Sequence, residues 1–136
     1  MSLFVDTGVW SLAFRRDAGP PDGEVSALKR ALEEGQTIVT TGLVLQELLQ
    51  GFAAPKARAQ ILEHFSAVPL LAPERADYSE AAELRNRCRR AGVQAGTLDA
   101  LIAYLCVRHG LTLLSTDRGF ENIAAHADFK LWQASS

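Results

Sequence analysis

Short apolar runs, separated by longer stretches of mixed polarity, divide the chain into alternating predicted strands and helices. The first run is uninterrupted and ends at Asp6, a pattern that favours a strand buried on both faces. We predict strands over residues 2–5, 37–39, 68–71, 111–114 and 129–132. Pro69 favours an edge position for the third strand, because proline has no N–H to give to a neighbouring strand. The alternating polarity of residues 129–132 predicts a second edge strand.

Apolar residues between these runs recur at the three- and four-residue spacing of amphipathic helices. Pro73 predicts a helix start, and Gly35 and Gly92 predict helix ends. Residues 42–52 predict another helix, and residues 97–108 predict one that is almost wholly apolar and therefore buried. The side chains expected to face the core are Val25, Leu28 and Leu32 in one helix, Ile61, Leu62 and Phe65 in a second, and Tyr78, Ala81 and Cys88 in a third.

Strands joined by helices of this length form βαβ units with parallel strands and right-handed crossovers. We therefore predict an α/β fold, with three layers (α/β/α) and a mostly parallel central sheet. The chain has 136 residues, of which 48% are hydrophobic, and this fits one compact domain over residues 1–136.

Composition and charge narrow the class of protein. No apolar run approaches the roughly 18 residues that span a bilayer, and residues 1–10 do not resemble a secretory leader, so we expect a cytoplasmic protein with no membrane partner. The net charge of −2 argues against a protein that grips nucleic acid with its whole surface, but is compatible with local basic patches. Cys88 and Cys106 lie in no metal-binding spacing, so neither a zinc site nor a disulfide framework is expected.

Four carboxylates follow or flank the predicted strands in a way that brings them to one edge of the sheet. Asp6 ends the first strand, and Asp117 follows the fourth. Asp99 opens the buried helix before that fourth strand, and Glu47 lies in the helix after the second. Open parallel sheets bind ligands in the crevice at the carboxyl ends of their strands, where strand order reverses. We expect the four acids to converge on that crevice.

Structural roles for the same acids remain open at this point. Asp6 and Asp117 are suitable helix caps or turn residues, Asp99 complements a helix dipole, and Glu47 could face solvent. Against these roles, Glu47 has no Lys or Arg three or four residues away, and no basic residue follows Asp99 in its helix before Arg108. An unpaired acid in a buried helix needs a cation or a raised pKa.

A divalent cation is the natural partner of such a cluster. Two carboxylates about 4 Å apart repel by roughly 4 kcal/mol at an effective dielectric near 20, and a bound cation offsets that repulsion. Ligands that are all oxygen, without His or Cys, select Mg²⁺ or Mn²⁺. Such an ion lowers the pKa of a bound water and neutralises a phosphate, which is the chemistry of phosphodiester hydrolysis. Whether one or two ions bind stays open.

Three segments, taken in order, resemble the motifs of PIN domains: FVDTGVW at residues 4–10, LDALIA at 98–103 and LLSTDRGFENIA at 113–124. Glu47, in LQEL, is similar to the helix acid of that family, and the length and spacing are most similar to VapC-type toxins. The resemblance implies a PIN-like fold, with Asp6, Glu47, Asp99 and Asp117 as the catalytic and metal-binding acids.

The same resemblance implies a Mg²⁺- or Mn²⁺-dependent endoribonuclease that acts on RNA as the toxin of a type II toxin–antitoxin pair. It further implies a homodimer and a VapB-type antitoxin whose C-terminal segment blocks the site. Two positions depart from the family pattern. Ser115 stands where the family often has Thr, and Gly119 where it often has Asp, so the second metal position stays open.

Basic and aromatic residues add candidates for RNA or partner contacts. Trp10 and Phe14, one helical turn apart beside Asp6, suit either a cleft or the core. The four arginines of residues 85–90 suit either RNA phosphates or a solvated helix end. Further candidates for RNA contacts, because they follow the site motifs, are Arg15, Arg16 and Arg118. His64, His109 and His126 occur in no catalytic or metal spacing.

Three other functions remain as alternatives. A catalytically degenerate PIN-like module could bind RNA or protein without cutting, and a PIN ribonuclease could serve RNA processing. A Mg²⁺-dependent phosphatase or phosphotransfer domain is the third. The segment from Asp6 to Gly8 lacks the second acid of a DxD phosphatase motif, and no Asp ends the third predicted strand.

Overall fold

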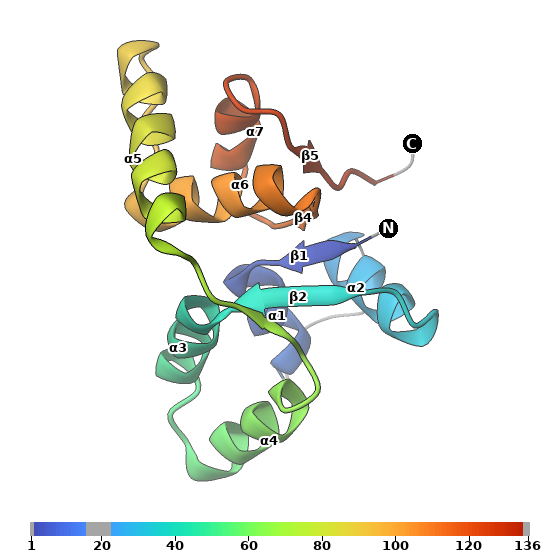
Figure 1. The fold of residues 1–136 in the computed structure, drawn as a ribbon. Coiled ribbons are helices and arrows are strands. Elements are labelled where there is room, and N and C mark those ends of the chain that lie inside the picture. Colours follow the sequence, from blue (N-terminus) through green and yellow to red (C-terminus); the bar gives the residue numbers. More distant parts are fainter. Residues whose placement is uncertain (1, 16–22, 135–136) are drawn as a thin grey trace.

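The computed structural model describes residues 2–15 and 23–134, which form a five-stranded sheet with helices between the strands (Figure 1). The strands are β1 (Leu3–Val5), β2 (Ile38–Thr41), β3 (Leu70–Leu71), β4 (Thr112–Leu114) and β5 (Lys130–Leu131). The helices are α1 (Thr7–Phe14), α2 (Gly23–Glu33), α3 (Gly42–Gly51), α4 (Pro55–Phe65), α5 (Arg75–Arg90), α6 (Thr97–His109) and α7 (Gly119–Ala124). Each predicted strand is present, shortened or shifted by one or two residues. None of the described helices is both long and apolar enough to cross a membrane.

The strand order, β3-β2-β1-β4-β5, makes β1 the centre of a sheet in which every pairing is parallel. The two strands predicted at the edges, β3 and β5, are the edge strands. From β1 the chain moves toward β3, and it then returns past β1 to β4 and β5. Right-handed crossovers that run in opposite directions lie on opposite faces of a sheet. The helices accordingly form two packed groups, α1 to α4 and α5 to α7, and the predicted three-layer α/β/α class is confirmed.

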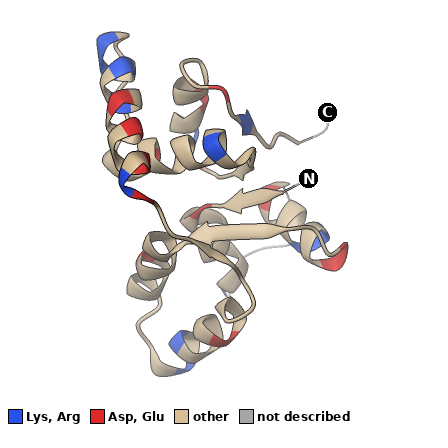
Figure 2. Cartoon of the chain, in the orientation of Figure 1, with Lys and Arg blue, Asp and Glu red and all other residues tan. Residues whose placement is uncertain are grey.

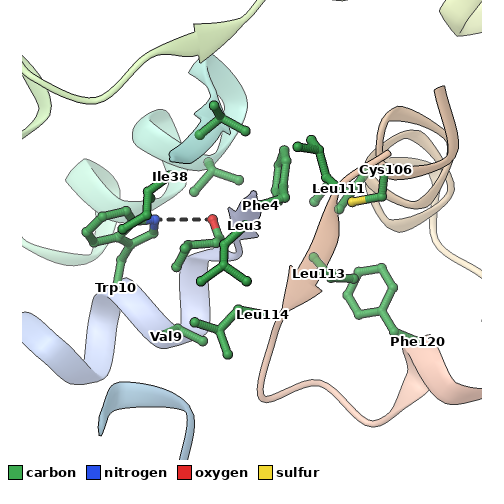
Figure 3. Close-up of a cluster of buried hydrophobic side chains, with 14 of the residues drawn as sticks. Leu3, Phe4, Val9, Trp10, Ile38, Cys106, Leu111, Leu113, Leu114 and Phe120 are labelled. Atoms are coloured by element: carbon green, nitrogen blue, oxygen red, sulfur yellow. Dashed lines mark hydrogen bonds between the residues drawn. The ribbon is translucent and has the colours of Figure 1, made fainter. Parts of the chain in front are cut away.

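The core surrounds β1 and β4, whose side chains are buried along their full length (Figure 3). Phe4 and Leu113 have no exposed surface. Trp10 is 1% exposed, its indole Nε1 donates to the carbonyl oxygen of Val5 at 3.1 Å, and its ring centroid lies 4.7 Å from that of Phe65. Trp10 therefore belongs to the core, which decides between the two roles that the sequence left open for it.

Helix α6 is the buried helix that the sequence predicts. Six of its residues are buried, and it ends at Gly110, whose φ of 63° lies in the left-handed region that glycine tolerates. Its neighbour α5 packs along it, and these two helices make the most extensive helix contact of the described chain. The two predicted core cysteines, Cys88 and Cys106, are buried on these helices and form no disulfide.

Three side chains predicted to face the core are exposed instead: Leu32 at 43%, Leu62 at 39% and Tyr78 at 54%. In α2, the small residues Ala27 and Ala31 flank Leu28 on the buried face, so the helix is rotated away from Leu32. The spacing of apolar residues predicts the centre of the buried face of a helix but not its borders. The prediction that Leu32 faces the core was therefore wrong. The helix expected to open at Pro73 begins at Arg75.

Asp77, rather than Tyr78, is the residue of the first turn of α5 that is buried. Its carboxylate accepts from the N–H of Glu74 at 2.7 Å, which forms half of a capping box, and from Nη1 of Arg108 in α6 at 2.6 Å. Burial raises the pKa of Asp77, but these hydrogen bonds outweigh it and hold the pKa below its ordinary value. One carboxylate thus caps α5 and fastens it to the end of α6.

Replacing Asp77 with Ala should lower the free energy of unfolding by roughly 2–3 kcal/mol, because two hydrogen bonds to a charged group are lost. Urea unfolding at neutral pH measures this, with Glu80→Ala as the control on the exposed side of the same helix. Since the folded-state pKa is depressed, the contribution of Asp77 exists above the ordinary carboxyl pKa and is lost as pH falls through the folded value. The gap between wild type and variant should therefore close in acid; equal effects of the two substitutions would contradict this role.

Candidate metal centre

The candidate centre lies where the strand order reverses, at the carboxyl ends of β1 and β4. These strands are paired with Val5 opposite Leu114, and the N–H of Asp6 donates to the carbonyl oxygen of Leu114 at 3.0 Å. The chain leaves β1 into α1 on one face of the sheet and leaves β4 toward α7 on the other. This is the crevice in which open α/β sheets place their ligands.

Asp6 sits at the centre of the crevice with both carboxylate oxygens engaged. Oδ1 accepts from the N–H of Thr7 at 2.8 Å, which makes Asp6 the N-cap of α1, and Oδ2 accepts from the hydroxyl of Ser115 at 2.9 Å. Burial raises the pKa of Asp6 above its ordinary value, and the charges of Glu47 and Asp117 add to the effect, whereas the two hydrogen bonds oppose it. The capping role and the place in the site therefore coexist.

Asp117 is exposed and held by the loop after β4. Its N–H donates to the hydroxyl of Ser115 at 3.0 Å, and its Oδ1 accepts from the N–H of Gly119 at 2.8 Å. A Cβ at position 119 would stand 3.1 Å from Oδ1 of Asp117, so glycine gives this turn room that a side chain would restrict. The serine hydroxyl thus links Asp6 to Asp117.

Glu47 approaches Asp6 through Thr7. The hydroxyl of Thr7, at the start of α1, donates to Oε1 of Glu47 in α3 at 3.0 Å. Sequence reasoning did not identify this role for Thr7; its position directly after the strand acid was the available signal. The bond joins residues 40 positions apart and brings the exposed Glu47 to the same edge of the sheet.

Asp99 completes the group from the first turn of α6, where it is partly buried. Burial and the negative charges of Asp117, Asp6 and Glu47 raise the pKa of Asp99 to about 6. The carboxylate therefore experiences all three other acids, as expected if four like charges share one crevice. No basic residue contributes to this shift.

The carboxylate oxygens of the four acids fit a hard divalent cation, although their side chains are not yet arranged to hold one. Within residues 2–15 and 23–134, no three Asp, Glu, His or Cys side chains are arranged so that they could already hold a metal ion. The acids are nevertheless coupled through their charges, and they offer oxygen donors alone. A cation at this position would offset the repulsion that adds to burial in raising the pKa values of Asp6 and Asp99.

The other candidate residues divide between core and surface. Phe14 is partly buried against the core. Arg15 and Arg118 are exposed, and Arg118 lines a cavity of about 360 Å³ together with Ser115 and Asp117. Arg16 lies outside the described residues. The ring of His64 packs against Trp10 and Phe14, and these contacts include none of the four acids.

Comparison with known proteins identifies the class. Residues 3–126 match the PIN domain family, and the chain belongs to that family. Ribonuclease VapC11 of Mycobacterium tuberculosis is 29% identical over 124 residues, which cover 90% of this chain and 91% of that protein. VapBC2 of Rickettsia felis, solved with a DNA fragment from its promoter, has a TM-score of 0.74 at 21% identity and covers 99% of this chain and 100% of its own. VapC20 of Mycobacterium tuberculosis, a sarcin-ricin loop cleaving toxin, has a TM-score of 0.70 at 19% identity over 98% and 100% of the two chains.

Replacing Asp99 with Asn should stabilise the metal-free protein, because it removes one of the mutually repelling charges while keeping the shape. After allowance for solvent screening of a half-exposed group, we expect a gain of about 1 kcal/mol at pH 7.5. A carboxyl pKa raised by folding makes wild-type stability fall as pH rises through about 6, so the gain should vanish near pH 4.

Thermal unfolding in EDTA at several pH values measures this effect. Asp128→Asn, an acid-to-amide change at an exposed residue that contributes to neither raised pKa, is the matched control and should show no such gain. If both variants change stability alike, Asp99 is an ordinary helix-start residue.

Proposed function

We propose that this chain is a Mg²⁺- or Mn²⁺-dependent endoribonuclease that acts in the cytoplasm as the toxin of a type II toxin–antitoxin pair. The observation that carries the proposal is the coupled group of four acids at the carboxyl edge of a PIN-domain sheet. The names of its relatives, ribonuclease VapC11 and the toxin VapC20, support the choice of RNA as substrate.

Asp6, Glu47, Asp99 and Asp117 would hold the cation. When bound, Mg²⁺ or Mn²⁺ lowers the pKa of a water and neutralises charge on the phosphate that is cut. The Ser115 hydroxyl orients Asp6 and the backbone of Asp117, and the Thr7 hydroxyl orients Glu47. These hydroxyls hold the carboxylates in place while the carboxylates are ionised and repel one another. A cation binds carboxylates in this ionised form.

Single-stranded RNA should be cleaved by the purified protein with Mg²⁺ or Mn²⁺, and cleavage should stop when EDTA is added. Asp99→Asn should abolish cleavage and largely lose the rise in melting temperature that Mg²⁺ gives the wild type. A ligand at about ten times its dissociation constant stabilises a fold by roughly 1.4 kcal/mol.

Asp128→Asn is again the control and should retain both properties. Cleavage that persists in EDTA would refute the metal mechanism. RNA binding and Mg²⁺ binding without any cleavage would instead favour the degenerate binding module.

The toxin assignment also requires a protein partner, which we propose to be a VapB-type antitoxin that blocks the crevice with its C-terminal segment. The Rickettsia felis relative, solved as VapBC2, supports this choice. We also propose a homodimer. Exposed Leu43 and Tyr78 border a largely apolar cavity of about 530 Å³ that also reaches Leu98 and Leu101, a surface that supports contact with a second chain.

Expression of the wild type in a bacterial host should arrest growth, and co-expression of the small protein encoded beside it should restore growth. Asp99→Asn, expressed to the same level, should be harmless, because the arrest comes from cleavage rather than from protein load. Growth curves with matched immunoblots measure this. An active ribonuclease that leaves growth unchanged would argue for a role in RNA processing instead of a toxin.

A further inference from the structure

The C-terminal half of α5 carries a group of arginines (Figure 2). Their contacts divide them into two pairs. Arg90 forms a salt bridge with Glu83 at 3.1 Å, and Nε of Arg87 donates to the carbonyl oxygen of His126 at 3.3 Å. These two side chains therefore have partners within the fold. Arg85 and Arg89, one helical turn apart, lie on a different side of the helix and line a cavity together.

That cavity has a volume of about 600 Å³ and is completed by residues 93–96, the segment that leads into α6. Nε of Arg85 donates to the carbonyl oxygen of Ala95 at 2.9 Å, which fixes the guanidinium against the wall, and Arg89 is exposed at the rim. The salt bridges of the described residues involve Arg90 and Arg108 but neither Arg85 nor Arg89. The cavity therefore holds two positive charges that form no salt bridge within the described residues.

Gly96 connects the cavity to Asp99 of the candidate metal centre. This residue lines the cavity and is the N-cap of α6, and Asp99 lies in the first turn of the same helix. A Cβ at Gly96 would stand 3.7 Å from Oδ2 of Asp99. One residue of the cavity lining thus lies next to one of the four acids.

We propose that the cavity lined by Arg85 and Arg89 binds a backbone phosphate of the RNA chain beside the one that is cut. This inference rests on the proposed function, because it takes the acid group as the place of cleavage. An RNA with one phosphate at the acids carries its next phosphates outward along the surface, and Gly96, which lines the cavity beside Asp99, puts the arginines on that route. Guanidinium groups pair with phosphate oxygens through planar, two-pronged hydrogen bonds.

The negative charge of the four acids and of the whole chain also favours a positively charged subsite for RNA. The four acids repel a polyanion, and the chain as a whole carries a net charge of −2, so RNA gains no general attraction from the surface. The two arginine charges of the cavity offset this repulsion. The subsite should therefore act on RNA binding and leave the chemical step unchanged.

Kinetics of RNA cleavage by Arg89→Ala and Arg90→Ala separate this role from a general loss of charge. The two variants lose the same charge from adjacent positions, but only Arg89 lines the cavity. For Arg89→Ala we expect KM to rise on the order of fivefold with kcat unchanged. The slope of log KM against the logarithm of salt concentration should decrease by about 0.7, because one phosphate contact is lost. Arg90→Ala should match the wild type, and Arg89→Lys, which keeps the charge, should restore the salt dependence.

Equilibrium binding of a fluorescent single-stranded RNA in EDTA tests the subsite without cleavage. Weaker binding by Arg89→Ala alone supports the proposal even if no RNA is cut, in which case only the proposed function fails. Equal effects of Arg89→Ala and Arg90→Ala, or no RNA binding by the wild type, overturn it. The cavity could instead bind carboxylates of a protein, and polyglutamate as a competitor tests this alternative. If Arg89→Ala weakens the binding of polyglutamate but not of RNA, the proposal is wrong.

Discussion

Mutual repulsion among carboxylates at the junction of β1 and β4 is the constraint to which the surrounding structure responds. Burial raises the pKa values of both Asp6 and Asp99, and the charges of Asp117 and Glu47 add to each shift. Keeping such charges together costs free energy, so rigid elements have to hold them. The central strands provide this support, since both are fully buried, and α6 adds six buried residues behind Asp99. A strong apolar core thus maintains an unfavourable polar edge.

Small polar groups position the acids without neutralising them. Ser115 donates to Asp6 and accepts from the N–H of Asp117, so a single hydroxyl connects the ends of two strands. Asp6 also caps α1, which satisfies an N–H that helix formation leaves unpaired. Structural and functional explanations for this carboxylate are therefore not competitors. The contrast with Asp77 is instructive, because an arginine compensates that buried acid and its pKa falls.

Local sequence patterns predicted the features that depend on residues close together in the chain. They did not predict features that depend on contacts between distant elements. Strand positions and the buried α6 follow from runs of apolar residues, the edge strands follow from Pro69 and from alternating polarity, and Asp6 and Asp117 were found from the ends of strands. The exposure of Leu32, Leu62 and Tyr78 depends on how each helix is rotated against the sheet, which spacing leaves undecided by about one position. The bonds from Thr7 to Glu47 and from Arg108 to Asp77 join residues 40 and 31 positions apart, beyond any local signal. The same limit hid the division of the α5 arginines into two pairs.

The pairing of β1 with β4 also sets an order of events during synthesis. Asp6 is made long before its Ser115 partner, which lies 109 positions later in the chain. The central strand has a neighbour on each side, and one of these neighbours, β4, is absent until α1 to α6 have been translated. A nascent chain that stops before β4 thus lacks Ser115 and Asp117 and leaves one edge of β1 without its hydrogen-bonding partner. The crevice can therefore assemble only after β4 and the loop that follows it have been translated.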